Sequence, residues 1–442
     1  MVRQIKKARI LGAGAIMTAV LLALTGCIGQ GAAPGQKNND DKPVSTTVPS
    51  GHITLTFTDS ASLTGPGLVK AFEALHPNVT IKYAPQQYND YVKSINLRMT
   101  SNDPPDIAVF QGSMNSLITG GYLLDLTQYE KAYGWDGAVS KAALDQWRFS
   151  DDAKRYGEGK LYAVPGEGLS IVSVWYNRVQ AKKAGISIPP SSISEFEADL
   201  KRAKDAGLQA INVGALDTGA MHLFYTVLDA MCPVADMQRW VFGTAGSNID
   251  VGCARAAAQK IIDWTKAGYI PKTSTGLGED DSAVAWANGE GVFTFNGNWN
   301  TAAALKGLGG DAGFFLLVDK GHSAAATGAS GGYVVSSKTK HPETVAAFLN
   351  FMTTAKAAMI QIKGGLLPVH AASVAMDTPL QAEIGTAYQQ VSKANGMVQF
   401  MEYAAPDMGD TLTAGLQSLI LGRMTAAQFT TSLQQVWDAY HE

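Results

Sequence analysis

The stretch ITLTFTDSASLTGPGLVKAFEALHPNVTIKY, residues 53–83, decides the fold class of this chain. Its first five residues, 53–57, alternate between apolar and polar side chains, a pattern that predicts a β-strand. Thr64-Gly65-Pro66 then opens a helical segment. Four apolar residues share one face of that helix: Leu68, Val69, Phe72 and Leu75. Because a second strand follows at 79–83, the chain begins with a strand, a helix and a strand, which predicts a right-handed crossover and a parallel sheet.

The same alternation continues along the chain. A helix is predicted from Gln87 to Thr100, with Val92, Ile95 and Met99 facing inward, and a strand at 106–110. A long apolar strand follows at 169–176, and Ser192 with Glu195 forms the capping box of a helix that Gly207 ends. Further strands are predicted at 210–214, 291–295, 313–318 and 332–336. Further helices are predicted at 254–267, 281–288, 342–353 and 406–421, which makes the chain an α/β protein.

The first 26 residues have the parts of an export signal. Basic residues precede an apolar stretch, 10–24, that is too short to span a bilayer core of about 30 Å. The stretch closes on Leu24-Thr25-Gly26-Cys27, which resembles the lipobox of bacterial lipoproteins. That resemblance implies cleavage before Cys27 and an acylated cysteine, with palmitate as one of the acyl chains. The alternative is a general secretory cleavage site that happens to contain a cysteine.

Composition limits what the rest of the chain can be. Residues 27–51 are rich in Gly, Asn, Asp, Ser, Thr and Pro, which is typical of a flexible linker. The segment 52–442 has periodic apolar patterns, and its length of about 390 residues predicts two domains. The formal net charge of −3 offers no basic excess for a nucleic acid or an anionic membrane surface. We therefore expect no nucleic-acid partner, and contact with the membrane only through the lipid anchor.

Besides Cys27, the sequence contains only Cys232 and Cys253. In an exported protein these two favour a disulfide, although two buried thiols are the alternative. Neither belongs to a CxxC pair, and the seven histidines are scattered. We therefore predict no metal site and no cofactor.

Eight short motifs occur in a recognisable order. They are Phe72-Glu-Ala-Leu-His-Pro-Asn-Val79, Pro105-Asp106-Ile107, Gly121-Tyr-Leu-Leu-Asp-Leu126, Gly159-Lys-Leu-Tyr-Ala-Val-Pro165, Trp175-Tyr-Asn177 with Pro190 and Ser194-Glu-Phe-Glu197, Gly291-Val-Phe-Thr-Phe-Asn-Gly-Asn-Trp299, Gly332-Tyr-Val-Val-Ser336 and Gly364-Gly-Leu-Leu-Pro368. In this order they resemble family 1 of the extracellular solute-binding proteins, the sugar-binding components of ABC importers, which include maltose-binding protein. The resemblance covers nearly the whole chain after the linker.

The resemblance implies a two-lobe, type II periplasmic-binding-protein-like fold, in which each lobe has a central, mostly parallel sheet flanked by helices. Lobe one would comprise 52–167 and 318–353, and lobe two 168–317 and 354–442. The chain would cross between lobes near Glu167, Val318 and Thr353. A carbohydrate, mono- or oligosaccharide, would bind between the lobes and be trapped when they close. We expect a monomer at the extracellular face of the bacterial cell membrane.

The implied partners are the permease subunits of an ABC transporter and their ATPase. The sequence has no GxxxxGK[ST] motif, so energy for transport must come from those partners.

Sugars need hydrogen-bonding amides and carboxylates around an aromatic surface. Trp299 is the strongest candidate, because the matching tryptophan of the sugar-binding family members lies in the cleft; packing within its own lobe is the alternative. Asn298 lies on the same turn. Asp59 and Gln111 directly follow the first and third predicted strands, where solvated loops would explain them equally well.

The other candidates are less distinct. Tyr88 could stack on the ligand or pack in the core, and Glu167 could face the ligand or the hinge. Asp217 follows a predicted strand, and Tyr333 lies beside Gly332 but could be strand core; Trp175 and Tyr176 are predicted core residues. The segment 407–412 has no aromatic residue where maltose-binding protein has a tryptophan, so its maltodextrin specificity does not transfer. Asp407 or Asp410 could supply a carboxylate there.

Four other functions are possible from the sequence. Gly328-Ala-Ser330-Gly-Gly332 matches the GxSxG pattern of serine hydrolases, but a strand follows it instead of a helix. Paired carboxylates of a secreted, lipid-anchored carbohydrate-active hydrolase cannot be recognised by spacing alone. A solute-binding protein for a non-sugar molecule and a structural lipoprotein are the remaining alternatives. We expect a binding protein, not an enzyme.

Overall fold

The computed structural model describes residues 43–442 except 61–62, 111–112, 330 and 370–376, all within one unit that spans residues 40–442. The predicted signal peptide and Cys27 lie outside the described residues. Gln111 and Ser330 lie outside them as well.

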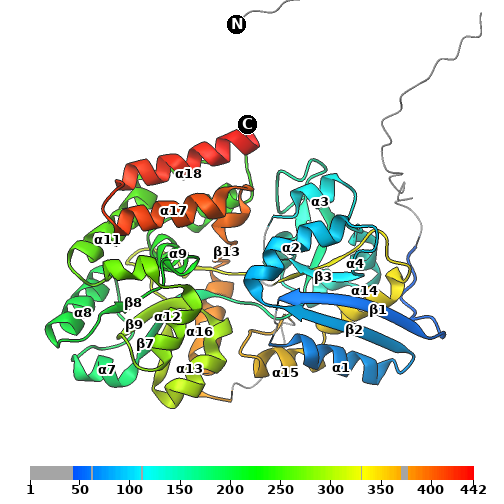
Figure 1. The fold of residues 1–442 in the computed structure, drawn as a ribbon, viewed down its shortest axis with the longest axis horizontal. Helices are drawn as coiled ribbons and strands as arrows, with labels where there is room; N and C mark the ends of the chain where they lie inside the picture. The colour runs from blue at the N-terminus through cyan, green and yellow to red at the C-terminus, as the bar shows by residue number, and fades with distance from the viewer. Residues whose placement is uncertain (1–42, 61–62, 111–112, 330, 370–376) are drawn as a thin grey trace, which may run out of the picture. The chain divides into compact units, whose positions relative to one another are not determined.

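The described chain folds into two halves, and each is built on its own sheet. The half called the first half below combines an early and a later part of the chain, and its sheet has the strand order β2-β1-β3-β12-β6 (Figure 1). The strands are β1 (Ile53–Ser60), β2 (Val79–Gln86), β3 (Ile107–Phe110), β6 (Ala163–Pro165) and β12 (Gly332–Val335). β1 pairs in parallel with β2 and with β3. The predicted alternation of the first strand is confirmed, because Ile53, Leu55 and Phe57 are buried between less buried threonines.

The second half is built on a sheet with the strand order β10-β7-β9-β8. These strands are β7 (Val172–Asn177), β8 (Ile211–Asn212), β9 (Phe293–Gly297) and β10 (Ala312–Phe315). β8 and β9 are parallel, whereas β7 is antiparallel to both β9 and β10. In the first sheet, β12 is likewise antiparallel to its neighbours β3 and β6. The prediction of mostly parallel sheets therefore needs one qualification: in each sheet, the strand that follows a crossing from the other half runs opposite to the rest.

Helices cover both sheets, and each predicted helical segment overlaps one of them. Those of the first half are α1 (Gly65–Leu75), α2 (Tyr88–Thr100), α3 (Asn115–Thr119), α4 (Thr127–Tyr133), α5 (Trp135–Ala138), α6 (Lys141–Asp145), α14 (Pro342–Met352) and α15 (Ala355–Lys363). Two inward-facing predictions are wrong. Leu75, at the last position of α1, is exposed, and Val92 of α2 is exposed because Tyr91 takes the buried position and donates a hydrogen bond from its hydroxyl to the Val109 carbonyl.

The helices of the second half include several that were not predicted. They are α7 (Arg178–Lys183), α8 (Ile193–Asp205), α9 (Gly219–Met231), α10 (Val234–Val241), α11 (Gly252–Lys266), α12 (Glu279–Ala287), α13 (Thr301–Gly307), α16 (Pro379–Lys393), α17 (Met408–Ile420) and α18 (Ala426–His441). α9 packs against β7, β9, α11 and α17, so it is the central helix of this half. Among the described residues no single helix has the length and apolarity to cross a membrane; α14 and α15 would qualify only together, as a pair bent by 66°, by length and composition alone.

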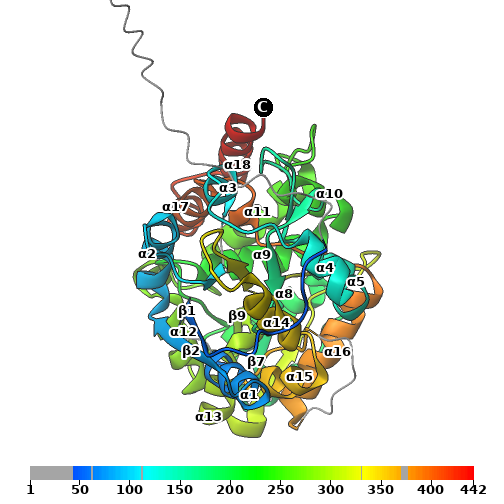
Figure 2. The same ribbon diagram turned by 90° about the vertical axis from the view of Figure 1, so that its right-hand side faces the viewer.

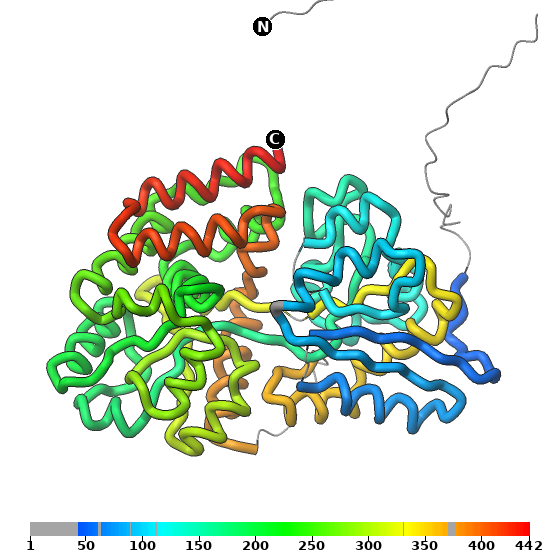
Figure 3. The backbone as a smooth tube through the Cα atoms, viewed as in Figure 1, coloured from blue at the N-terminus to red at the C-terminus, as the bar shows by residue number. Residues whose placement is uncertain are grey.

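Three glycine-containing segments connect the halves (Figure 3). Leu169 and Leu367 exchange both backbone hydrogen bonds, and Ser170 N donates to Ala329 O. The first crossing therefore lies beside Glu167. Gly168 has a φ of +124°, and a Cβ there would lie 2.7 Å from Leu366 Cβ, so only glycine fits where the crossing segments meet.

The other two crossings lie later in the chain than the predicted positions near Val318 and Thr353. β11 (Ala326–Thr327) still belongs to the second half, because it pairs with β13 (Met397–Val398) and packs against α9. α15 still belongs to the first half, because it packs against α1 and α14 and lies beside α1 in Figures 1 and 2. The structure thus places these crossings near Gly328 and Ala329 and at about residues 364–369.

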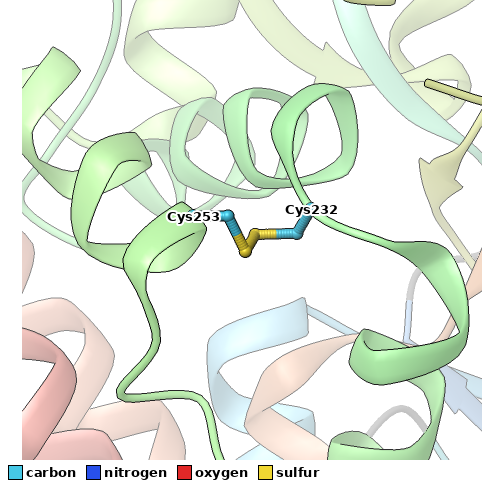
Figure 4. Close-up of a disulfide and its surroundings, with 2 residues drawn as sticks. All are labelled: Cys232 and Cys253. Atoms are coloured by element: carbon cyan, nitrogen blue, oxygen red, sulfur yellow. A yellow bond between two sulfur atoms is a disulfide. The ribbon is translucent and has the colours of Figure 1, made fainter. Parts of the chain in front are cut away.

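A disulfide joins Cys232, at the end of α9, to Cys253 in the first turn of α11, with the two Cα atoms 5.4 Å apart (Figure 4). The two cysteines are 21 residues apart in the sequence, and the loop that the bond closes contains α10. In the chain-entropy description, a loop of this length stabilises the fold by about 3 kcal/mol, because the reduced chain has more unfolded conformations.

Replacing both Cys232 and Cys253 by alanine is therefore expected to lower the free energy of unfolding by about 3 kcal/mol. Urea unfolding of the double variant and the parent, each with and without dithiothreitol, measures this difference. Dithiothreitol should destabilise the parent and leave the double variant unchanged. A parent that unfolds at the same urea concentration with and without the reductant would contradict a stabilising disulfide.

Candidate functional site

A cavity of about 410 Å³ lies between side chains of the two halves. This volume falls within the range of roughly 300–1,000 Å³ that is usual for small-molecule sites. The first half contributes Ser60, Leu63, Gln87, Tyr88 and Glu167. The second half contributes Thr218, His222, Glu279, Asp280, Trp299, Phe400, Glu402 and Tyr403. Residues of the three crossing segments complete the wall: Gly168, Ser170, Ala329, Gly331 and Leu366.

Trp299 forms the aromatic centre of the second-half wall. It lies on the turn η2 (Asn298–Asn300), which directly follows β9. A Cβ at Gly297 would lie 1.9 Å from the Trp299 ring, so the glycine lets the indole lie across the turn. The indole Nε1 donates a hydrogen bond of 3.3 Å to Glu279 Oε1, and the ring meets that of His222 edge-on at 5.3 Å between centroids. These contacts hold the ring in place while it remains only half-buried.

Glu279 is fixed at the start of α12 by several neighbours. Thr218 Oγ1 donates to its carboxylate, and the backbone N–H of Glu279 donates to Asp217 Oδ1 at 2.8 Å. His222 projects from α9, and its Nδ1 lies 3.6 Å from Glu279 Oε1. The carboxylate is therefore positioned by a hydroxyl and an indole N–H instead of by a lysine or arginine.

A second carboxylate, Glu402, comes from the turn η4 (Met401–Tyr403). Tyr225 of α9 donates a hydrogen bond of 2.5 Å to Glu402 Oε2. Burial raises the pKa of Glu402, and the Tyr225 hydrogen bond acts against that rise. Phe400 lies between the Tyr225, Tyr403 and Trp299 rings, with centroid distances of 6.2, 5.9 and 6.4 Å. Aromatic faces and carboxylates therefore alternate along this wall.

The first-half wall has Tyr88 at the start of α2, where 40% of its surface is exposed. Burial of its hydroxyl group and the nearby Glu402, Glu279 and Asp217 carboxylates raise the pKa of Tyr88, so it stays a neutral hydrogen-bonding group. Carboxylates of the second half therefore interact electrostatically with a residue of the first half.

Behind this wall, two carboxyl groups lie close together. Asp59, at the end of β1, is fully buried, and Glu167 is 7% exposed at the cavity. Burial raises the pKa of Asp59 well above its usual range, the Glu167 charge raises it further, and a hydrogen bond of 3.1 Å from the Tyr83 hydroxyl acts in the opposite direction. Two negative charges on these neighbouring carboxyls therefore disfavour each other.

The structure brings three predicted site residues to the cavity: Trp299, Glu167 and Tyr88. Asp59 lies behind the wall, and Tyr333 is fully buried in the first core with its ring 5.3 Å from that of Phe57. Gln111 lies outside the described residues. The roles of these residues in binding sugar stay predictions.

Three other predicted residues have structural partners. Asn298 is fully buried; its Oδ1 accepts from Ile171 N at 2.8 Å and its Nδ2 donates to Gly365 O at 3.1 Å, so it joins two crossing segments. Asp217 supports α12 through the hydrogen bond described above. Asp407 precedes α17 and is exposed away from the cavity lining.

Sequence reasoning missed His222, Glu279, Phe400, Glu402 and Tyr403. His222 lies in α9, a helix buried on every side, so no amphipathic pattern marked it. Glu279 could have been found as the first acidic residue of a helix that faces the Trp299 turn. Phe400, Glu402 and Tyr403 lie in and next to a short turn without a periodic pattern.

The arrangement suits recognition of a polyhydroxylated ring. Carboxylates accept hydrogen bonds from hydroxyls, and the Gln87 amide can both accept and donate them, while the aromatic faces contact C–H surfaces. Within the described ranges, no group of three or more His, Cys, Asp or Glu side chains is arranged to hold a metal ion. Ser330, on which the serine hydrolase alternative rests, lies outside those ranges.

Two α/β halves joined by three crossings around a shared cavity are an arrangement suited to binding a small solute. The chain belongs to the bacterial extracellular solute-binding protein family, whose pattern matches residues 60–359. The predicted family resemblance is therefore confirmed.

Named relatives agree with this family. The multiple sugar-binding protein of Streptococcus mutans is 20% identical over 325 residues, 71% of this chain and 74% of the relative. An ABC transporter extracellular-binding protein of Pyrococcus horikoshii is 22% identical over 305 residues, 65% of this chain and 64% of the relative. Proteins of Brucella abortus named as binding proteins are 24% identical over 161 residues, and the match spans only 37% of their length.

Solved structures share the fold. A chitin oligosaccharide binding protein superposes with a TM-score of 0.73 at 22% identity, covering 88% of this chain and 98% of that chain. A Listeria monocytogenes ABC substrate-binding protein in complex with cycloalternan gives a TM-score of 0.69 at 18% identity, with the same coverage. A Streptococcus pneumoniae solute-binding protein in complex with the blood group A-trisaccharide gives 0.68 at 19% identity, covering 87% and 100%. The predicted two-lobe α/β fold is confirmed.

Proposed function

We propose that this protein is an extracellular, lipid-anchored carbohydrate-binding protein that captures a mono- or oligosaccharide and delivers it to an ABC importer. The observation that carries the proposal is the cavity whose wall combines Trp299, Phe400 and Tyr403 of one half with Tyr88 and Glu167 of the other. The names of the Streptococcus mutans relative and of the oligosaccharide-binding structures support a saccharide as the ligand.

The proposed mechanism is a shift between open and closed arrangements of the halves. A ligand that touches Tyr88 and Trp299 at once makes all of its contacts only when the halves are closed. It therefore stabilises closure by the difference between its affinities for the two arrangements. The crossing segments, which include Gly168 with its φ of +124°, are the places where the backbone would bend. The permease would then recognise the closed form.

The anchor is the second part of the proposal. Its support is the sequence Leu24-Thr25-Gly26-Cys27 after a short apolar stretch. Replacing Cys27 by serine is expected to abolish incorporation of radiolabelled palmitate and to release the protein from the membrane fraction. Serine keeps the size of the side chain but cannot form the thioether. Undiminished labelling of the variant would contradict lipidation at Cys27.

Isothermal titration calorimetry of the parent against a panel of mono- and oligosaccharides tests the proposed function. Binding of at least one saccharide, with no new reducing ends after prolonged incubation, is the expected result. Absence of binding across the whole panel would contradict carbohydrate recognition. Hydrolysis of a bound member would favour a carbohydrate-active enzyme instead.

A further inference from the structure

The charge of the cavity wall is one-sided. Four carboxylate residues line the cavity: Glu167, Glu279, Asp280 and Glu402. Within the described residues, the lining contains no lysine and no arginine, and His222 is its one ionisable base. A neutral sugar would leave the Glu279 and Glu402 carboxylates of this wall without a cation beside them.

The carboxylates of the second half are held by uncharged donors. Thr218 and Trp299 donate to Glu279, and Tyr225 donates to Glu402. In the part of the chain that the structure describes, neither carboxylate forms an ion pair with lysine or arginine. Burial and the neighbouring Glu279 charge raise the pKa of Glu402, while hydrogen bonds and the nearby His222 act against that rise.

His222 supplies an independent observation. Its side chain is buried, with 5% of the residue exposed, and it lines the cavity. Its Nδ1 is beyond hydrogen-bond distance of Glu279 and has no hydrogen-bond partner among the described residues. His222 therefore leaves a buried polar atom without a partner next to Glu279, in the wall of the cavity.

Aromatic faces surround the same space. Trp299, Phe400 and Tyr403 belong to the second-half wall and Tyr88 to the first. Aromatic faces attract cations through their quadrupoles, most strongly when the cation is removed from water. Carboxylates combined with aromatic faces are the chemistry that recognises an alkylammonium group.

We propose that the ligand is a saccharide with a free, protonated amino group, that is, an amino sugar that is not N-acetylated. This inference rests on the proposed carbohydrate function and adds the charge of the ligand to it. The ammonium group lies between Glu279 and Glu402, and the sugar ring stacks on Trp299. N-acetylation removes the charge and adds bulk, so the acetylated form fits this wall less well.

The test uses ligands that share one skeleton and differ at C2. The two sets are glucosamine, glucose and N-acetylglucosamine, and their β-1,4-linked disaccharides chitobiose, cellobiose and N,N′-diacetylchitobiose, each titrated into the parent protein by calorimetry. Spermidine serves as a cation without a sugar ring. The free-amine saccharide is expected to bind at least about ten-fold more tightly than its neutral counterparts. Its affinity should fall when NaCl is raised from about 50 to about 500 mM, because salt screens the charge interaction.

A matched pair of variants locates the effect. Glu279→Gln keeps the shape of the side chain and an acceptor for the Trp299 N–H but removes the charge, so the preference for the amine should fall about ten-fold. Glu290→Gln, at an exposed carboxylate of the same half outside the cavity lining, should leave it unchanged. The same loss of preference in both variants would contradict a local role for Glu279.

The outcomes separate this inference from the proposed function. Equal or tighter binding of the neutral or acetylated saccharide would overturn the inference and leave carbohydrate binding intact. Binding of spermidine without binding of any saccharide would overturn carbohydrate binding, and the inference with it. Absence of binding by every ligand in the sets would overturn the inference as well.

Discussion

Replacing Trp299 by alanine is expected to weaken saccharide binding by about 100-fold, the largest loss of any single substitution in the cavity. The indole lies across its own turn, and two contacts hold it in place. Glu279 accepts from its Nε1, and the His222 ring meets it edge-on. Truncation removes the stacking surface and also leaves Glu279 with one donor fewer. Calorimetric titration of the parent and the variant with the tightest ligand of the panel measures the loss.

Trp299→Phe is the matched control, since it keeps an aromatic face but removes the N–H and one of the two fused rings. We expect it to lose about ten-fold or less. Because the indole is only half-buried, thermal unfolding of both variants should stay close to that of the parent. If alanine at this position binds as tightly as tryptophan, Trp299 is a packing residue and the stacking surface lies elsewhere.

Much of the fold could be predicted because local patterns and tertiary burial agree. β1 alternates because one face lies on the core, and Phe72 follows Leu68 on the buried face of α1. A helix without a solvent face could not be predicted in this way. α9 has buried residues at nearly all of its positions, from Gly219 to Ala230, so its apolar residues do not repeat with the period of a helix on a surface.

The crossings were misplaced for a different reason. The helical pattern of 342–353 predicts where α14 ends, but not that α15 folds back onto α1. Likewise, β11 is a two-residue strand whose place depends on β13, about 70 residues later in the chain. Such pairings are set by contacts between distant segments. The glycines at 168, 328 and 364–365 were the local signal that marked the crossings more closely.

The candidate site likewise combines residues that local patterns predict with residues that only distant contacts bring together. Trp299, Glu167 and Tyr88 lie next to motifs or strand ends, where a ligand of an α/β fold is expected. His222, Glu279 and Glu402 lie on three separate elements, α9, α12 and η4, and become one wall only after the second half has folded. Residues whose function depends on convergence of distant segments leave no signal of their own in a single sequence.

A buried carboxyl group in α9 makes the stability of the second half depend on pH. Asp229 is 4% exposed, and its Oδ2 accepts a hydrogen bond of 2.5 Å from the backbone N–H of Thr327, next to a crossing segment. Among the described residues, Oδ1 has no hydrogen-bond partner. Burial raises the pKa of Asp229 to about 7, although the Thr327 hydrogen bonds act against the rise.

The sign of the effect follows from proton linkage. An unfolded Asp loses its proton near pH 3.8, whereas folded Asp229 holds its proton up to about pH 7. Between these values the folded state binds more protons, so the contribution of this group to stability falls as the pH rises. Since one unit of pKa corresponds to about 1.4 kcal/mol, Asp229 destabilises the fold by about 4 kcal/mol above pH 7, relative to its protonated form.

Asp229→Asn should remove this loss, because the amide is neutral at every pH and its oxygen still accepts from Thr327. The variant should match the parent near pH 4 and exceed its free energy of unfolding by about 4 kcal/mol near pH 8. Urea unfolding at pH 4, 6 and 8 measures the difference, and Asp236→Asn, at an exposed position on α10, controls for the loss of one carboxylate. A difference between variant and parent that stays constant from pH 4 to 8 would show that Asp229 carries its charge in the folded protein throughout, and that burial in α9 does not shift its titration.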